Sequence, residues 1–231
     1  MLTNCTPTLY KNELHVWRYS VRHEDYLTEL HAPVLSEEER VRCSEFLYDP
    51  DKRKYICNHV FRRSVLARYL GIPPVHVQYS YTNFGKPFFN KSEIQFSHSY
   101  RNDIGLLAVY KGGEVGIDIE RDKEMDDVVT FSNFSFSEAE KAMIFANGKF
   151  DKSTFFTFWT FKESFIKAIG TGLNADIRKF DLADFMHQEI KELPFGGNTN
   201  WIIKKLSAPE GYKAAYAVKG IVERLIEFNY N

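Results

Sequence analysis

The feature of this 231-residue chain that most restricts its fold is a pattern that occurs twice, roughly 100 residues apart. A serine followed three residues later by a glutamate, the capping-box signature of a helix start, occurs in Ser36–Glu39 and again in Ser137–Glu140. Each helical unit is predicted to end at a glycine, Gly71 or Gly170, because glycine suits the left-handed end of a helix. The pattern therefore predicts two similar helical units.

Each helical unit is followed by a similar strand, predicted over 107–112 in the first unit and over 215–220 in the second. This duplication indicates an α+β protein made of two similar α/β halves. The turn Lys111-Gly112-Gly113 is the predicted boundary, because paired glycines mark turns. We therefore divide the chain into an N-terminal half, residues 1–111, and a C-terminal half, residues 112–231.

An acidic and a basic side chain interrupt the apolar pattern of the second helical unit. Apolar residues recur at helical spacing between Phe158 and Ile169 and predict a buried face. Glu163 and Lys167 lie four residues apart, so they share another face of the helix and can hold the two ends of one charged ligand. The alternative is an exposed ion pair, which is common at this spacing.

Two further acids lie on a predicted strand, Val115–Glu120. Because side chains alternate between the faces of a strand, Asp118 and Glu120 point the same way while the neighbouring isoleucines face the core. The repulsion between the two carboxylates has to be met by a cation or by solvent. Carboxylate oxygens suit Mg²⁺, with Glu163 as the expected third ligand. The alternative is a pair of solvated acids that protects a strand edge.

The composition excludes several classes of protein. The net charge of −1 argues against a general nucleic-acid binder, which carries a basic excess. No apolar run approaches the length of a membrane-spanning helix, and the first residues lack the pattern of a signal peptide. Three cysteines cannot all pair, and they fit a reducing compartment: Cys5, Cys43 and Cys57. We therefore expect a cytoplasmic enzyme that acts on neither nucleic acid nor membranes.

Four short motifs follow one another along the chain: Gly85-Lys86-Pro87, Phe96-Ser97-His98-Ser99, Gly116–Glu120 and Trp159–Lys167. Together they resemble the signature of the 4′-phosphopantetheinyl transferases, specifically the long, surfactin-synthetase-activating type. The resemblance implies a pseudo-twofold tandem of halves, with the active site and coenzyme A at their interface. It also implies transfer of the phosphopantetheine arm of coenzyme A to a serine of an acyl or peptidyl carrier protein, with release of 3′,5′-ADP.

The resemblance further implies a role for each matching residue. Mg²⁺, or Mn²⁺ in its place, would be held on the diphosphate by Asp118, Glu120 and Glu163. A phosphate oxygen would be neutralised by Lys167. The phosphates and adenine nucleotide of coenzyme A would be contacted by Lys86, Ser97 and His98. The cations of the first half that best match the family at the 3′-phosphate are Arg42, Lys54 and Arg63.

The identity of the general base stays open. Glu163 can take the serine proton while it touches the metal, or a metal-bound water can relay the proton to Asp118 or Glu120. Glu140 matches a glutamate proposed as the base in the family, but it also occupies the third position of a capped helix and can act only as a cap. Lys162 points away from Glu163 and is expected to be a secondary contact or a solvated lysine.

Two departures from the family pattern affect the predicted 3′-phosphate site. Glu39 stands where many relatives have a basic residue. Asn58-His59 replaces the usual pair of a small residue and an arginine. The selectivity for coenzyme A over its dephospho form is therefore an open question.

The acidic carrier protein requires a receiving surface of apolar and basic groups. We expect this surface at the loop Phe131–Phe136, although its three phenylalanines can equally belong to the core.

The two halves lie in one chain and can together form the whole coenzyme A groove without a partner subunit, so a monomer is expected.

Two other classes of protein fit part of the pattern. A carrier-binding regulator that has lost catalysis would lack an acid of the metal set, whereas Asp118, Glu120 and Glu163 are all present. Another Mg²⁺-dependent phosphotransferase would bring a phosphate-binding glycine loop or a basic nucleic-acid surface, and neither is evident. The transferase interpretation is therefore preferred.

Overall fold

The computed structural model of the chain describes residues 7–20, 32–172, 177–183 and 201–230. Its helices are α2 (Glu37–Ser44), α3 (Asp49–Leu70), α4 (Val128–Ser135), α5 (Glu138–Ile144) and α6 (Lys152–Ile169), with 3₁₀ turns at Ala32–Val34, Pro74–His76, Ala146–Gly148 and Ile177–Lys179. Its strands are β1 (Glu13–Ser20), β2 (Ser80–Tyr81), β3 (Pro87–Phe88), β4 (Ile94–Arg101), β5 (Ile104–Lys111), β6 (Val115–Arg121), β7 (Trp201–Leu206), β8 (Tyr212–Lys219) and β9 (Arg224–Tyr230). The predicted α+β class is confirmed.

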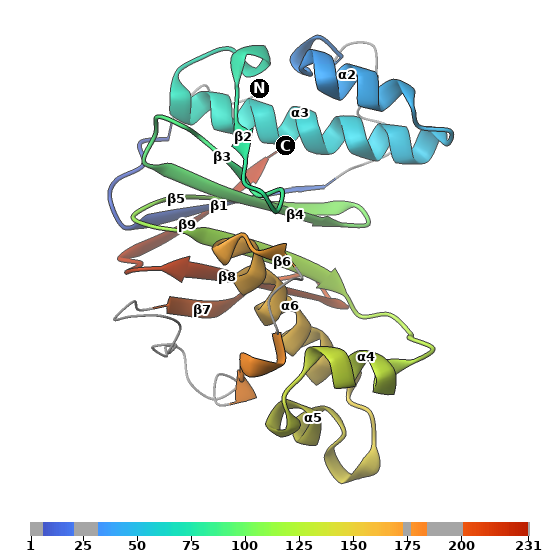
Figure 1. Cartoon of the computed structure of the whole chain (residues 1–231). Coiled ribbons are helices and arrows are strands. Elements are labelled where there is room, and N and C mark those ends of the chain that lie inside the picture. The colour runs from blue at the N-terminus through green and yellow to red at the C-terminus, as the bar shows by residue number, and fades with distance from the viewer. Residues whose placement is uncertain (1–6, 21–31, 173–176, 184–200, 231) are drawn as a thin grey trace.

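Most of the strands belong to two sheets that lie one above the other (Figure 1). The first sheet has the strand order β4-β5-β1-β9, and the second has the order β6-β8-β7. β2 and β3 pair separately with each other. β4 and β6 are therefore edge strands, each with one side available to other parts of the protein.

The molecule has four layers, in the order helix, sheet, sheet and helix (Figure 1). Apolar residues of the two facing sheets, among them Leu106 and Ile117, form a central core. α3 covers the outer face of the first sheet through a cluster that includes Phe61. α6 covers the outer face of the second sheet through its phenylalanines, including Phe158 and Phe161. Each sheet thus has one face in the central core and a helix packed on the other.

Both predicted capping boxes are confirmed, at the starts of α2 and α5. In each, the serine side chain accepts a hydrogen bond from the backbone N–H of the glutamate, and the glutamate accepts one from the backbone N–H of the serine. The long helices that follow also end as predicted. Gly71 after α3 and Gly170 after α6 have left-handed φ angles of 65° and 71°.

The last strand, β9, crosses from the second half of the chain back to the first sheet. It runs parallel to β1, with Leu14 beside Leu225 and Trp17 beside Phe228. The rings of Trp17 and Phe228 stack with their centroids 4.4 Å apart. The last strand of the predicted C-terminal half, residues 112–231, therefore completes the sheet formed by the N-terminal half.

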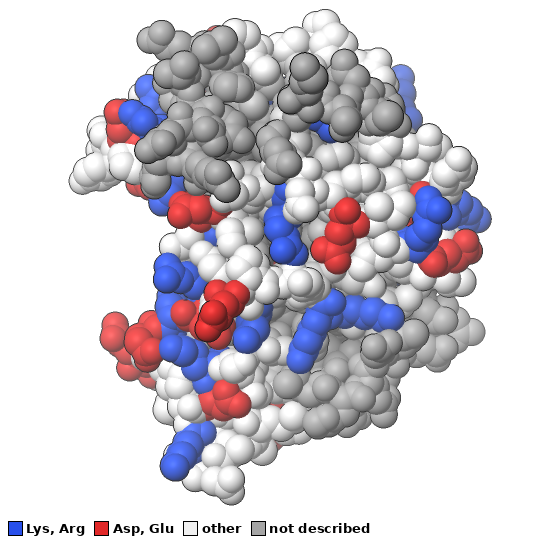
Figure 2. Space-filling model, turned by 180° about the vertical axis from the view of Figure 1, so that it is seen from behind, with Lys and Arg blue, Asp and Glu red and all other residues white. Residues whose placement is uncertain are grey.

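Charged and polar groups are spread over the exterior. On the face seen in Figure 2, the Lys and Arg side chains lie among Asp and Glu side chains. Among the described residues, no helix combines the length and the apolar character needed to cross a bilayer. Cys43 and Cys57 are buried free thiols.

The second sheet and α6 are in backbone contact at Gly116. A Cβ atom at this position would lie 1.9 Å from the carbonyl oxygen of Ser164 and 2.4 Å from the backbone nitrogen of Ala168. Both atoms belong to the body of α6, so neither can move aside as a flexible side chain would. The sequence needs glycine here because β6 and α6 leave no room for a side chain.

We expect Gly116→Ala to lower the free energy of unfolding by about 3 kcal/mol, because the new methyl group has to push α6 away from β6. Urea denaturation followed by circular dichroism measures this change. An unfolding midpoint equal to that of the unmodified protein would show that the two elements are not packed as closely as described.

Candidate active site

The candidate site lies where the edge strand β4 meets the edge strand β6. The Ser97 hydroxyl accepts a hydrogen bond from the backbone N–H of Ile117 at 3.1 Å. The Ser99 hydroxyl donates one to the Asp118 carboxylate at 2.8 Å. The two serines are two residues apart on a strand, so both point toward β6. They join the first sheet to the second along this edge.

The two carboxylate oxygens of Asp118 have different surroundings. The side chain is 2% exposed. Its Oδ1 accepts hydrogen bonds from Ser99 and, at 2.6 Å, from the Nζ of Lys167 on α6. Its Oδ2 is buried and has no hydrogen-bond partner among the described residues. A buried carboxylate oxygen is costly to leave unpaired, so this oxygen is suited to bind an added donor or a cation.

Glu120 is the second acid of β6, and it is held by a cation of β4. It forms an ion pair with Arg101, whose guanidinium donates hydrogen bonds to it. Burial and the nearby charge of Asp118 raise the pKa of Glu120, while Arg101 and Lys167 act in the opposite direction. The prediction that Asp118 and Glu120 face one side of β6 and the isoleucines face the core is confirmed.

Glu163 on α6 lies near enough to these two acids for their charges to affect its pKa. Burial, together with the charges of Asp118 and Glu120, raises its pKa to about 7, although Lys167 acts in the opposite direction. As the side chains lie, however, no three His, Cys, Asp or Glu residues in the described part of the chain form a group that could hold a metal ion. The three acids influence one another without forming a finished metal site.

A cavity of about 450 Å³ adjoins this edge. It brings together residues from three of the sequence motifs, and the lining includes Lys86, Ser97, His98, Glu163 and Lys167. Arg62 of α3 also contributes to its wall. The cavity thus joins cationic and polar groups from both halves of the chain.

Burial also affects the protonation of two other cavity residues, His98 and Lys86. The Nε2 atom of His98 lies 3.1 Å from the Tyr19 hydroxyl. Burial, together with the charge of Arg62, holds the pKa of His98 well below its usual value, so the imidazole is neutral at neutral pH. Lys86 donates a hydrogen bond to the carbonyl of Ala168 near the end of α6, and burial lowers its pKa to about 8.

Comparison with known sequences agrees with this geometry. Residues 114–217 match the family described as the 4′-phosphopantetheinyl transferase superfamily, and residues 11–111 match the one described as 4′-phosphopantetheinyl transferase, N-terminal. The chain belongs to the 4′-phosphopantetheinyl transferases.

Individual relatives of this transferase carry the same description. The 4′-phosphopantetheinyl transferase HetI of Nostoc sp. strain PCC 7120 is 30% identical over 182 residues, which cover 76% of each chain. The 4′-phosphopantetheinyl transferase Sfp of Bacillus subtilis is 28% identical over 188 residues, 78% of this chain and 80% of Sfp. The L-aminoadipate-semialdehyde dehydrogenase-phosphopantetheinyl transferase of Mus musculus is 28% identical over 160 residues, 64% of this chain and 52% of that one. The family resemblance found in the four motifs is confirmed.

The cations predicted for the 3′-phosphate do not line the cavity of the transferase. Arg42 is exposed and pairs with Glu45, and Lys54 lies part-buried on α3. Arg63 is buried, and its guanidinium donates to Glu39 at 2.5 Å and to the carbonyl of Val77 at 2.8 Å. Arg63 therefore contributes to the packing of the first half, and phosphate binding by Arg42, Lys54 and Arg63 stays a prediction.

Three site residues have no role assigned to them in the sequence analysis of the transferase, although one of them belongs to a named motif: Arg62, Ser99 and Arg101. Ser97, Ser99 and Arg101 occupy alternate positions of β4. Because side chains alternate between the two faces of a strand, this spacing indicates that Ser99 and Arg101 point the same way as Ser97. Arg62 had no such signal, because it was one of many cations on a long helix.

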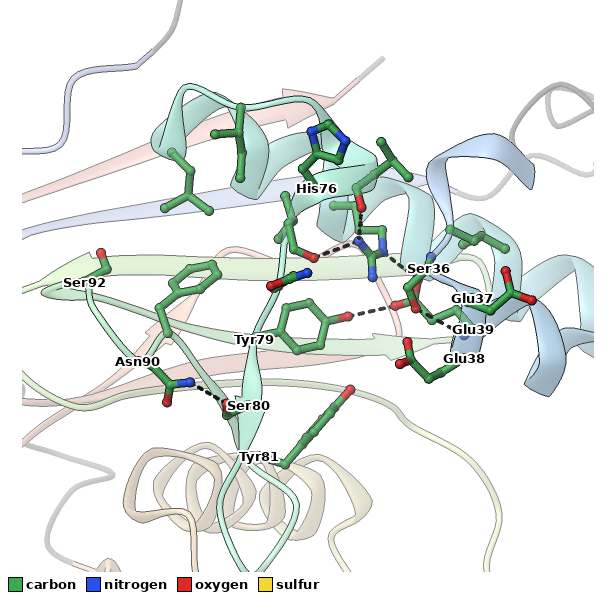
Figure 3. A pocket seen from close by; sticks show the side chains of 18 of the residues that line it. Ser36, Glu37, Glu38, Glu39, His76, Tyr79, Ser80, Tyr81, Asn90 and Ser92 are labelled. Atoms are coloured by element: carbon green, nitrogen blue, oxygen red, sulfur yellow. Dashed lines mark hydrogen bonds and ion pairs between the residues drawn. The ribbon is translucent and has the colours of Figure 1, made fainter.

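A second and larger cavity, of about 1040 Å³, lies in the first half of the transferase (Figure 3). Its lining holds both acids, among them Glu37 and Glu38, and cations, among them Arg40 and Lys91. Glu39 is buried in its wall, where the Tyr79 hydroxyl donates to it at 2.8 Å and His59 Nδ1 lies 2.7 Å away. Burial alone would raise the pKa of Glu39, but His59 and Arg63 hold it far below its usual value.

The prediction of a solvated Lys162 is wrong. Lys162 and Glu140 are both 0% exposed and form an ion pair of 2.8 Å in the interior of the transferase. Glu140 also completes the capping box of α5, as predicted. Its second predicted role, as the general base, has to be judged against this burial.

The segment predicted as a docking loop is mainly helix α4. Phe131 packs against Phe155 and Trp159, and Phe136 is buried in the core. Phe134 alone of the three phenylalanines projects outward, with 73% of its surface exposed. Both predicted environments therefore occur within this one segment of the transferase.

We expect Glu163→Gln to stabilise the metal-free transferase at pH 8 but not at pH 4.5. Folding raises the pKa of the Glu163 carboxyl from 4.5 to about 7. As the pH rises through this range, the carboxyl ionises more readily in the unfolded chain than in the folded protein, so the folded protein becomes less stable. Glutamine cannot ionise and therefore avoids this loss. The expected gain at pH 8 is on the order of 1 to 3 kcal/mol, measured by urea unfolding in the presence of a chelator.

The exposed residue Glu210 provides the control for this measurement. Glu210→Gln should leave stability unchanged at both pH values, because solvent screens an exposed charge. A Glu163→Gln variant that is less stable than the unmodified protein at pH 8 would contradict the described surroundings of Glu163.

Proposed function

We propose that this transferase moves the 4′-phosphopantetheine arm of coenzyme A onto a serine of an acyl or peptidyl carrier protein. The serine oxygen forms a bond to the phosphorus nearest the pantetheine, and the bond from that phosphorus to the bridging diphosphate oxygen breaks. The serine proton goes to a carboxylate, and 3′,5′-ADP leaves. The observation that carries the proposal is the buried Asp118, with one unpartnered oxygen, beside a cavity lined by Arg62, Lys86 and Lys167.

Asp118, Glu120 and Glu163 would hold Mg²⁺, or Mn²⁺ in its place, on the diphosphate. When bound, the ion supplies positive charge where negative charge develops on the phosphate oxygens. The unpartnered Oδ2 of Asp118 supports this assignment. Mg²⁺ commonly takes only one or two carboxylates and completes its shell with substrate phosphates and water, which agrees with three acids that are neighbours but not a closed cluster.

The cationic groups of the cavity would bind the remaining charge of coenzyme A. Lys167 is 31% exposed on its side chain and reaches from α6 to Asp118, so it lies between the acids and the cavity. Lys86 and Arg62 add two further donors on the first half of the chain. Ser97 and His98 are uncharged donors and acceptors at the same wall, which suits phosphate and ribose oxygens.

Glu163 is the proposed general base. A base has to reach the proton that it removes, and its pKa should lie near the working pH. Glu163 lines the cavity, and burial raises its pKa to about 7. Glu140 fulfils these two requirements, reach and a suitable pKa, less well than Glu163, because it is fully buried and pairs with Lys162. We therefore assign Glu140 no direct chemical role.

We infer that the two halves form a pseudo-twofold tandem with the site between them. Each half has one helix with a capping box, one long helix that ends in a left-handed glycine, and a sheet, and the edge strands β4 and β6 of the two sheets meet at the site. All residues proposed for the site come from one chain, which supports a monomer. Buried free thiols at Cys43 and Cys57 support a reducing, cytoplasmic location.

The test is the intact mass of an apo acyl carrier protein after incubation with this protein, coenzyme A and Mg²⁺. We expect a Mg²⁺-dependent phosphopantetheine adduct on the carrier serine. Glu163→Ala should lower the rate by about 100-fold or more, because it removes both a metal ligand and the base. Glu210→Ala, at an exposed position outside the site, is the matched control and should retain the full rate.

Two other results would redirect the assignment. Coenzyme A binding without transfer to any of several acyl and peptidyl carriers would favour a carrier-binding regulator. Metal-dependent turnover of nucleotides without a carrier adduct would favour a different phosphotransferase.

Phe134 on α4 is the proposed apolar contact for the carrier protein. We expect Phe134→Ala to raise KM for the carrier about 5-fold or more and to leave KM for coenzyme A unchanged, because the ring is 73% exposed and does not line the cavity. Steady-state kinetics with each substrate varied in turn measures both constants. Leu47→Ala, at another exposed apolar residue, is the control, and equal effects of the two variants would rule out a specific contact at Phe134.

A further inference from the structure

The buried ion pair between Glu140 and Lys162 connects three separate segments of the second half. Lys162, at the centre of α6, lies 2.8 Å from Glu140 and donates to the carbonyls of Ile177 and Phe180 at 2.7 and 2.8 Å. Glu140 in turn accepts hydrogen bonds from the backbone N–H groups of Ser137 at 2.7 Å and Leu182 at 2.8 Å. The pair therefore holds α5, α6 and residues 177–182 together.

This connection is adjacent in sequence to the proposed chemistry. Lys162 precedes Glu163, and Lys167 follows one turn later on the same helix. A helix moves as a rigid unit over such a distance, so a shift of α6 at Lys162 displaces Glu163 and Lys167 together. Phe180 stacks on Phe165 with ring centroids 3.8 Å apart, so the segment bonded to Lys162 also lies against this part of α6.

We propose that Glu140 and Lys162 are positioning residues, which fix α6 so that Glu163 and Lys167 face Asp118. This inference rests on the proposed function and replaces the predicted role of Glu140 as a base with an indirect one. Neither side chain is exposed, so neither reaches a substrate atom. Both act through the position of α6.

The choice of an ion pair in place of apolar side chains suits this role. A buried ion pair contributes little net stability, because desolvation offsets the attraction, but loss of one partner leaves an uncompensated charge. Its hydrogen bonds are directional and define one arrangement of the three segments, whereas apolar contacts permit small shifts. Removal of one partner should therefore disturb α6 more than removal of both.

The test compares Lys162→Met, Glu140→Gln and the double variant with Val65→Ala, a control in the fully buried core of the first half. Each single variant should lower kcat by about 10-fold or more while KM for coenzyme A changes by less than about 3-fold. The double variant should be no slower than the slower single variant, because the two residues act as one unit. Val65→Ala should lower Tm with little effect on kcat below its Tm.

Hydrogen exchange provides a readout that does not depend on activity. The amides of Glu163 to Lys167 should lose protection in Lys162→Met and keep it in Val65→Ala. If the single variant does not fold, the double variant, which leaves no unpaired charge, carries the comparison against the unmodified protein.

Three outcomes would overturn the proposal. Full activity in Lys162→Met beside an inactive Glu140→Gln would identify Glu140 as a chemical group. Unchanged kcat and unchanged exchange in α6, with only Tm reduced, would limit the pair to general stability. An unmodified protein that binds coenzyme A but transfers nothing to any carrier would remove the proposed function, and with it the positioning role, whatever the exchange result.

Discussion

The candidate active site depends on the backbone contact between β6 and α6 at Gly116. Because no side chain separates the two elements there, Asp118 on the strand and Glu163 and Lys167 on the helix approach one another from rigid secondary structure and not from loops. The second fixed contact is the meeting of β4 with β6, through Ser97 and Ser99. Sites built on such elements keep their geometry without the cost of ordering a loop. The fold thus brings two sheet edges and one helix to a single point.

Three acids so close together would repel one another in the absence of internal cations. Lys167 neutralises Asp118, and Arg101 neutralises Glu120, while Glu163 has a raised pKa and is protonated for part of the time near neutral pH. The ligand-free protein is therefore stable with its acids already gathered. Under the proposed function, a bound metal and a diphosphate would need only to redistribute these ion pairs, which would limit the reorganisation that binding requires.

Sequence reasoning succeeded where the signal is local. Both capping boxes, the left-handed glycines and the two faces of β6 follow from residues within a few positions of one another, and all are confirmed. It failed where partners lie far apart in the sequence. Lys162 and Glu140 are 22 positions apart, and nothing near Lys162 indicates that a carboxylate and two carbonyls will enclose it. The burial of Arg63 against Glu39 has the same cause, since the pairing depends on how α2 packs on α3.

The parallel pairing of β9 with β1 has a consequence for biosynthesis. β1 leaves the ribosome long before its neighbour on one side, residues 224–230, because Glu13 and its partner Arg224 are 211 positions apart in the sequence. Until those residues emerge, the first sheet has an open edge at β1, and an unpaired strand edge is a template for aggregation. The first sheet therefore cannot be completed until the residues between β1 and β9 have been synthesised, and chaperones that bind exposed strands can act on this edge in the meantime.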